Sequence, residues 1–112
     1  MKFTLKLRRA GTPDILAKVI SVYETDSPYL IITMRESLEQ KNIEELTRSI
    51  HSLKASSAML GAQFLADQCH IVENTLRDGG ELRDANKIID RIEIMCQLAT
   101  ILLRSELVGE EG

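Results

Sequence analysis

The chain has very few aromatic residues. Among its 112 residues there is no tryptophan, and there are only two phenylalanines and two tyrosines. A single domain of this length must therefore build its core mainly from Leu, Ile, Val, Met and Ala side chains. That composition favours helices packed against helices, so the sequence predicts one all-α domain.

Long apolar runs and a strong excess of one charge are also missing. No apolar stretch approaches the length that crosses a membrane, and the first residues lack the pattern of a secretion signal. The formal net charge is only −3, and the basic residues are scattered along the chain. We therefore expect a cytoplasmic protein that neither inserts into a membrane nor binds nucleic acid.

Cysteine is scarce as well. The two cysteines, Cys69 and Cys96, both fall on apolar stripes of expected helices. Thiols in such positions are usually buried and reduced in a cytoplasmic protein. We expect this arrangement rather than a disulfide or a metal site, and we expect no cofactor.

Two segments near the start each begin with a hydroxyl residue followed by proline, a pair typical of a helix start. Thr12-Pro13 opens the first segment, which apolar spacing continues to Tyr23. Ser27-Pro28 opens the second, which continues to about Leu38. The sequence thus predicts two separate helices before residue 40, the first being an additional N-terminal helix.

Three further helices are expected. Asn42, with Glu45 three residues later, is a capping-box pattern for a helix that ends near Gly61. The next helix spans about residues 62–77 and stops at a glycine pair, and the last spans about residues 81–107.

Short connections favour antiparallel neighbours. We therefore predict an all-α, up-and-down antiparallel four-helix bundle over residues 12–108, with the additional N-terminal helix. Residues 1–11 are expected to form an arm or linker, and residues 109–112 a tail.

His51 stands out on the helix that begins after Asn42. With about 100° per residue, a helical wheel gathers one apolar face, made of Ile43, Leu46, Ile50, Leu53, Ser57 and Leu60. His51 lies roughly 130° from the centre of that face, so it should point to solvent or to the mouth of a groove. Lys54 lies one turn away, and the next turn carries only Ala55 and Ala58, which leave the imidazole uncovered.

This combination suits the transient carrying of a phosphoryl group. A neutral imidazole attacks phosphorus without a separate base, and a nearby ammonium offsets charge on the phosphoryl oxygens. Small neighbours allow a second protein to bring an aspartyl phosphate into line with the ring. The competing interpretations are an ordinary surface histidine for His51 and a solvated surface lysine for Lys54.

Glu73 is a second candidate, because it lies at the edge of the apolar stripe of its helix and faces a neighbouring helix. Its carboxylate is placed to accept a hydrogen bond from one nitrogen of His51, which would leave the other nitrogen as the nucleophile. An interhelical salt bridge, for example with Arg48, explains Glu73 equally well. His70, by contrast, lies far from the apolar stripe.

The pattern His51-x-Leu53-Lys54-x-Ser56, followed by Gly61-Ala62, resembles the core motif of histidine-containing phosphotransfer (HPt) domains. The stretch from Cys69 to Asn74 is similar to one that follows the phosphoacceptor helix in chemotaxis-kinase phosphotransfer domains. Residues 13–38 are more similar to HPt modules at the C-terminal end of hybrid sensor kinases. The resemblance covers about residues 13–107.

The resemblance implies a role for each matching residue. It makes His51 the phosphorylated residue, Lys54 and Ser56 helpers on the phosphate side, and Glu73 the group that orients the ring. Further residues are expected to contact the partner: Thr47, Arg48, Ala55, Ala58 and His70. Ala55 departs from the family, which usually has glycine there, and its methyl group is too small to abolish transfer.

We therefore predict a phosphocarrier that relays a phosphoryl group between receiver-domain aspartates in a two-component phosphorelay. It is not expected to be a kinase, because it has no glycine-rich nucleotide loop. The implied partners are a response-regulator receiver domain, whose own acidic site holds Mg²⁺, and a hybrid sensor histidine kinase. We expect a monomer.

Two other functions remain possible. One is an inactive HPt-like adaptor bundle that binds receiver or kinase domains without transfer. The other is a metal-dependent enzyme that uses His51, His70 and Glu73, although the chain lacks an HExxH or paired ExxH pattern.

Overall fold

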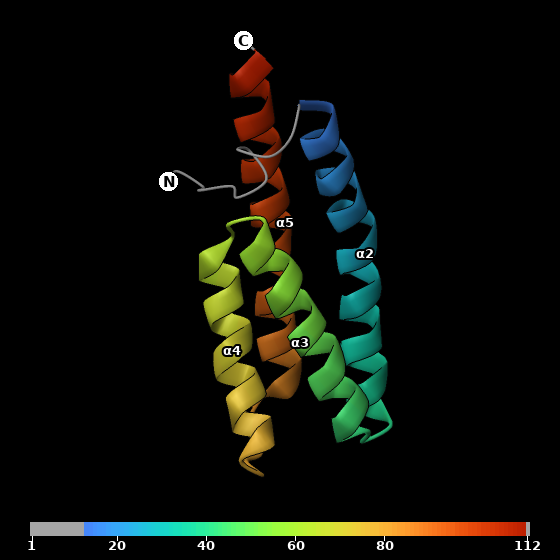
Figure 1. The fold of residues 1–112 in the computed structure, drawn as a ribbon. Helices are drawn as coiled ribbons and strands as arrows, with labels where there is room; N and C mark the ends of the chain where they lie inside the picture. The colour runs from blue at the N-terminus through green and yellow to red at the C-terminus, as the bar shows by residue number, and fades with distance from the viewer. Residues whose placement is uncertain (1–12, 112) are drawn as a thin grey trace.

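The computed structural model describes the backbone of residues 13–111 and the side chains of residues 15–106. Within this part of the chain there are four helices. These helices are α2 (Pro13–Glu39), α3 (Ile43–Met59), α4 (Gln63–Arg77) and α5 (Ala85–Glu111). They run alternately up and down, and α3 and α5 each pack against both α2 and α4 (Figure 1). This arrangement is the predicted antiparallel four-helix bundle. The expected arm at residues 1–11 lies outside the described residues.

The two helices predicted before residue 40 are one continuous helix. Pro28 lies inside α2, where it lacks the N–H that would donate to the Glu24 carbonyl, and an interior proline costs about 3 kcal/mol. The buried face nevertheless continues on both sides of the proline, through Leu16, Ile20, Tyr23, Ser27, Ile31, Met34 and Ser37. Packing of this face against α3 and α5 outweighs the local cost. The predicted additional N-terminal helix is therefore, within the described residues, the first half of α2.

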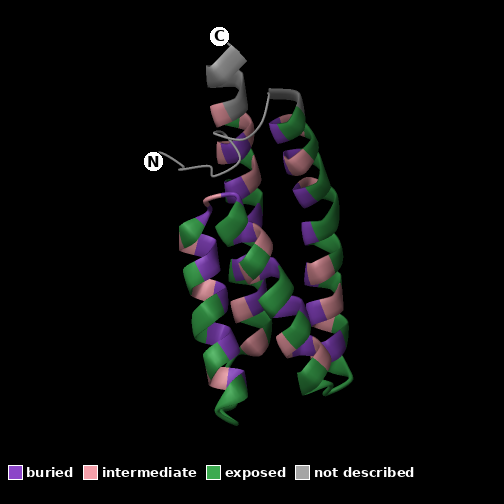
Figure 2. Cartoon of the chain, viewed as in Figure 1, coloured by how far each residue is buried: buried purple, intermediate pink, exposed green. Residues whose placement is uncertain are grey.

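The core is aliphatic, as the composition predicts. Buried residues occur on all four helices, where they alternate with exposed residues along each helix (Figure 2). Cys69 and Cys96 are both part of this core and form no disulfide. Burial raises the pKa of each thiol to about 12, so both remain protonated near neutral pH.

The start of α3 confirms half of the predicted capping box. The Asn42 side chain accepts a hydrogen bond from the Glu45 backbone N–H at 3.2 Å. The Glu45 carboxylate does not return to Asn42, because it binds Arg48 at 2.8 Å, and the Asn42 N–H donates to the Ser37 carbonyl instead. Gly61, with a φ of 86°, ends the helix region as expected.

The last helix is shifted along the chain relative to the prediction. Asp84 has a φ of 53°, a left-handed conformation that single residues adopt but helices do not, so α5 begins only at Ala85. At its other end α5 continues to Glu111, so the backbone of residues 109–111, expected as a tail, is helical.

Candidate functional site

The exposure of His51 agrees with the helical wheel. Its side chain is 53% exposed, whereas Leu46, Ile50 and Leu53 on the other face of α3 are completely buried. The expectation for Ile43 is wrong, because this residue is 49% exposed. Ile43 is the first residue of α3 and lies two turns before His51, at the edge of the apolar face, where a side chain is only partly covered.

Glu73 of α4 lies directly beside the histidine. The His51 Nδ1 and Glu73 Oε2 atoms are 2.5 Å apart, and the Glu73 side chain is completely buried. Both alternatives left open by the sequence form: Glu73 contacts the imidazole, and it also makes an interhelical salt bridge, although with Lys54 and not with Arg48. Arg48 instead pairs with Glu45 on its own helix.

Besides the imidazole, two cationic side chains bind the Glu73 carboxylate. The Lys54 Nζ atom donates to Oε1, and the Arg77 Nη2 atom donates to Oε2 at 3.1 Å. The Lys54 side chain is only 23% exposed, so it is not the solvated surface lysine of the alternative interpretation. Arg77 was not singled out from the sequence, although its spacing of four residues from Glu73 on one helix is a signal for such a pair.

The electrostatics of this cluster keep Glu73 ionised. Burial by itself would raise the pKa of the Glu73 carboxyl, but the hydrogen bonds from Lys54 and His51, with the charge of Lys54, outweigh it and leave the pKa below its ordinary value. The carboxylate is thus a fixed negative charge directly against one nitrogen of the imidazole.

Three members of the cluster, His51, Glu73 and Arg77, line an open hollow of about 470 Å³ between α3 and α4. Its lining combines an exposed apolar residue with charged and hydroxyl groups: Ile43, Glu44, Thr47, Arg48, His51, Glu73 and Arg77. Thr47 and Arg48, both expected at the partner surface, therefore do lie beside His51. Ala55 and Ala58 are exposed on the following turns of α3, as expected.

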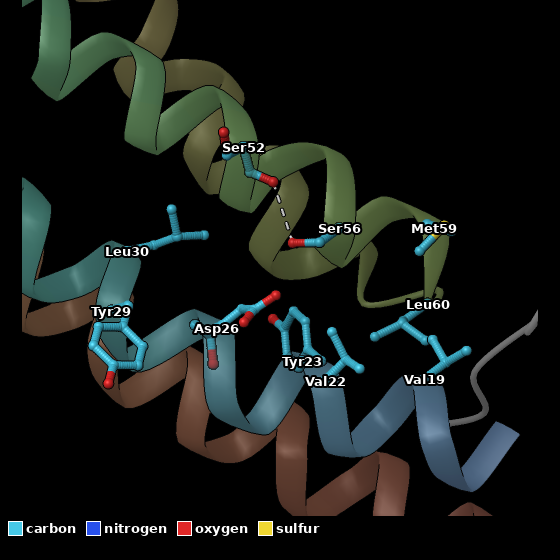
Figure 3. A pocket seen from close by; sticks show the side chains of 11 residues that line it. Val19, Val22, Tyr23, Asp26, Tyr29, Leu30, Ser52, Ser56, Met59 and Leu60 are labelled. Atoms are coloured by element: carbon cyan, nitrogen blue, oxygen red, sulfur yellow. Dashed lines mark hydrogen bonds between the residues drawn. The ribbon is translucent and has the colours of Figure 1, made fainter.

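Two predicted residues lie away from the hollow. His70 is exposed on α4 and hydrogen-bonds through Nε2 to the Asn74 amide at 3.1 Å. Ser56 donates to the backbone carbonyls of Ser52 and Leu53 and faces a groove on the opposite flank of α3, toward α2 (Figure 3). The structure does not bring Ser56 to His51, because the two lie roughly 140° apart around the helix.

No group of His, Cys, Asp and Glu side chains within the described residues is arranged to hold a metal ion. His51 and Glu73 contact one another, and Glu73 also binds two cations, so the two side chains do not converge on a shared empty position. Among the described helices, none combines the length and apolarity needed to cross a membrane.

A family model described as "Hpt domain" matches residues 18–102, which include all the residues of this cluster. The chain belongs to the HPt domain family. This membership confirms the resemblance seen in the sequence, and with it a role for this HPt domain in two-component phosphorelay signalling.

Curated relatives match more than half of this chain. Histidine-containing phosphotransfer protein 5 from Arabidopsis thaliana is 37% identical over 67 residues, in a match that covers 57% of this chain and 43% of that protein. Histidine-containing phosphotransfer protein 1 from Oryza sativa subsp. japonica is 29% identical over 65 residues, in a match that covers 56% of this chain and 44% of that protein. The matches thus span less than half the length of these relatives.

A solved structure shares the fold. The crystal structure of histidine-containing phosphotransfer protein B from Pseudomonas aeruginosa PAO1 matches 80% of this chain and 76% of that chain, with a TM-score of 0.71 and 27% sequence identity. The similarity extends over most of the four-helix bundle, so the bundle, and not only the motif around His51, is that of the family.

Proposed function

We propose that this HPt domain carries a phosphoryl group on His51 and relays it between the aspartates of receiver domains. The observation that carries the proposal is the contact between His51 Nδ1 and the buried Glu73 carboxylate. A carboxylate that accepts from Nδ1–H fixes the tautomer in which Nε2 bears the lone pair. In the described part of the chain no hydrogen bond engages Nε2, and the ring borders the open hollow.

The transfer step follows from this geometry. The Nε2 lone pair attacks the phosphorus of an aspartyl phosphate on the receiver, an N–P bond forms, and the P–O bond to the aspartate breaks. The aspartate leaves as a carboxylate with the bonding electron pair. Positive charge develops on the ring while Nδ1 keeps its proton, and the adjacent Glu73 carboxylate stabilises that charge. The reverse reaction passes the group to the next aspartate.

In this proposal the HPt domain is a phosphocarrier without kinase activity of its own. Its partners are a response-regulator receiver domain, which brings Mg²⁺ in its own acidic site, and a hybrid sensor histidine kinase. The receiver docks over the hollow, whose lining includes Ile43, Thr47 and Arg48, and over the small exposed residues Ala55 and Ala58. We propose a cytoplasmic monomer that acts by this transient contact.

Incubation of the purified chain with a receiver domain phosphorylated on its aspartate tests the proposal. We expect a label that is lost in acid and stable in base, as is typical of phosphohistidine, and that disappears in His51→Gln. The matched control is His70→Gln, because His70 is exposed on α4 outside the hollow. A label that survives in His51→Gln would overturn the assignment, and receiver binding without any label would favour the adaptor alternative.

A further inference from the structure

The three groups on the Glu73 carboxylate are not equivalent. Oε1 has one partner, Lys54, whereas Oε2 has two, His51 Nδ1 and Arg77 Nη2. With a neutral imidazole, the cluster holds one negative charge and two positive charges. One cation is therefore in excess of what the buried carboxylate requires.

Lys54 is the cation that the carboxylate cannot release without cost. It is the partner of Oε1, its side chain is mostly covered, and it does not line the hollow. Moving Lys54 toward an incoming phosphoryl group would leave a buried, charged oxygen unpaired, and such groups are expensive.

Arg77 has the opposite properties. Its side chain is 57% exposed and lines the hollow together with His51. If Arg77 moves away, Oε2 is still satisfied by the Nδ1–H of His51. A guanidinium also carries five N–H donors in a planar fork that matches phosphoryl oxygens, and the bond to Glu73 uses only Nη2.

We propose that Arg77 is the cation that binds the phosphoryl oxygens during transfer, while Lys54 holds the Glu73 carboxylate in place. Arg77 exchanges its bond to Glu73 Oε2 for bonds to the phosphoryl group as the N–P bond forms. This inference rests on the proposed phosphorelay function, and it assigns to Arg77 the helper role that the resemblance implied for Lys54.

The test compares Arg77→Gln and Arg77→Lys with Arg91→Gln. Arg91 is an exposed arginine on α5, a helix that does not pack against α3, so its removal changes the net charge equally without touching the hollow. The measurements are the rate of phosphotransfer from a phosphorylated receiver, the ³¹P resonance of the phosphohistidine, and the thermal midpoint.

We expect Arg77→Gln to slow transfer by about tenfold or more; this is less than the loss of about 10²–10³-fold on removal of one oxyanion-hole donor, because Arg77 is 57% exposed. Arg77→Lys should recover part of the rate, because it restores the charge without the fork. The ³¹P resonance should shift in Arg77→Gln, and Arg91→Gln should behave like wild type. Arg77→Lys also serves as the decisive variant if Arg77→Gln does not fold.

Two results would overturn this inference while leaving the proposed function intact: wild-type transfer rates in folded Arg77 variants, or an equal loss of rate in Arg91→Gln. A wild-type chain that accepts no phosphoryl group from any phosphorylated receiver tested would instead contradict the proposed function itself.

Discussion

The two flanks of α3 have small residues and a hollow each, but they differ in what lies beneath the surface. The flank toward α4 has a buried carboxylate with three nitrogen partners under His51. The flank toward α2 has an apolar groove of about 440 Å³, with walls that include Val22, Tyr29 and Met59 (Figure 3). The chemistry of the first flank thus depends on two residues of the neighbouring helix, Glu73 and Arg77.

The buried polar contact between α3 and α2 involves two hydroxyl groups and no charge. The Tyr23 hydroxyl and the Ser57 hydroxyl are 2.9 Å apart in the core, and burial raises the pKa of the tyrosine, so this pair stays neutral. A neutral pair satisfies its hydrogen bonds and orients no nucleophile. Both flanks of α3 have a hollow, but only the flank toward α4 places a buried carboxylate, Glu73, against an exposed imidazole, His51. This difference makes only that flank a candidate site.

The largest effect is expected from a bulky substitution on the His51 flank. Ala58→Trp should abolish receiver docking and phosphotransfer, because the partner must approach within bonding range of the ring. The helical content and thermal midpoint should stay near wild type, since Ala58 is exposed. The matched control is Met59→Trp, because the adjacent Met59 lines the opposite groove. Normal transfer by Ala58→Trp would place the docking surface elsewhere.

Removing the Lys54 ammonium, which binds the buried Glu73 carboxylate, should lower the free energy of unfolding. Lys54→Met leaves Oε1 of the buried Glu73 without its partner, and we expect a loss of about 1–3 kcal/mol in the free energy of unfolding. Urea denaturation measures this loss against Lys87→Met, which removes an exposed lysine from α5. Equal stability of the two variants would mean that Lys54 is an ordinary surface lysine after all.

The charge of Glu73 should also appear in the pH dependence of stability. Because the pKa of this carboxyl is lowered in the folded state, its contribution is complete above the ordinary glutamate pKa of about 4.3 and is lost as the pH falls through the lowered value. The stability difference between wild type and Glu73→Gln should therefore be largest near neutral pH and shrink in acid. A difference that grows toward acid would contradict the lowered pKa.

The smallest effect on stability and phosphotransfer is expected from a substitution on the flank of α3 toward α2. Ser56→Ala removes a hydroxyl that bonds only to carbonyls of its own helix, so the stability should change by no more than about 0.5 kcal/mol. The rate of phosphotransfer should also be unchanged, as measured with the same labelled receiver. A clear loss of transfer would restore Ser56 to the phosphate-side role that the resemblance implied.

Most of the bundle was predictable because its signals are local. The Asn42 cap, the turn at Gly61 and the outward direction of His51 depend only on residues within a few positions along the chain. The continuity of α2 was missed because Ser27-Pro28 is a valid local signal for a helix start. The stripe that overrides it stabilises the fold only when α3 and α5 are in place.

The sequence by itself determined the helical class, the aliphatic core and the exposure of one histidine, because 3.6-residue periodicity and composition are properties of each segment alone. Only the tertiary structure decided which groups share the Glu73 carboxylate. For the partners from α3, that choice depends on how α3 packs against α4, which sets whether Lys54 turns inward, whether Arg48 reaches Glu73, and whether Ile43 is covered. Side-chain partners across two helices follow from the relative placement of the helices, and no pattern within either helix encodes that placement.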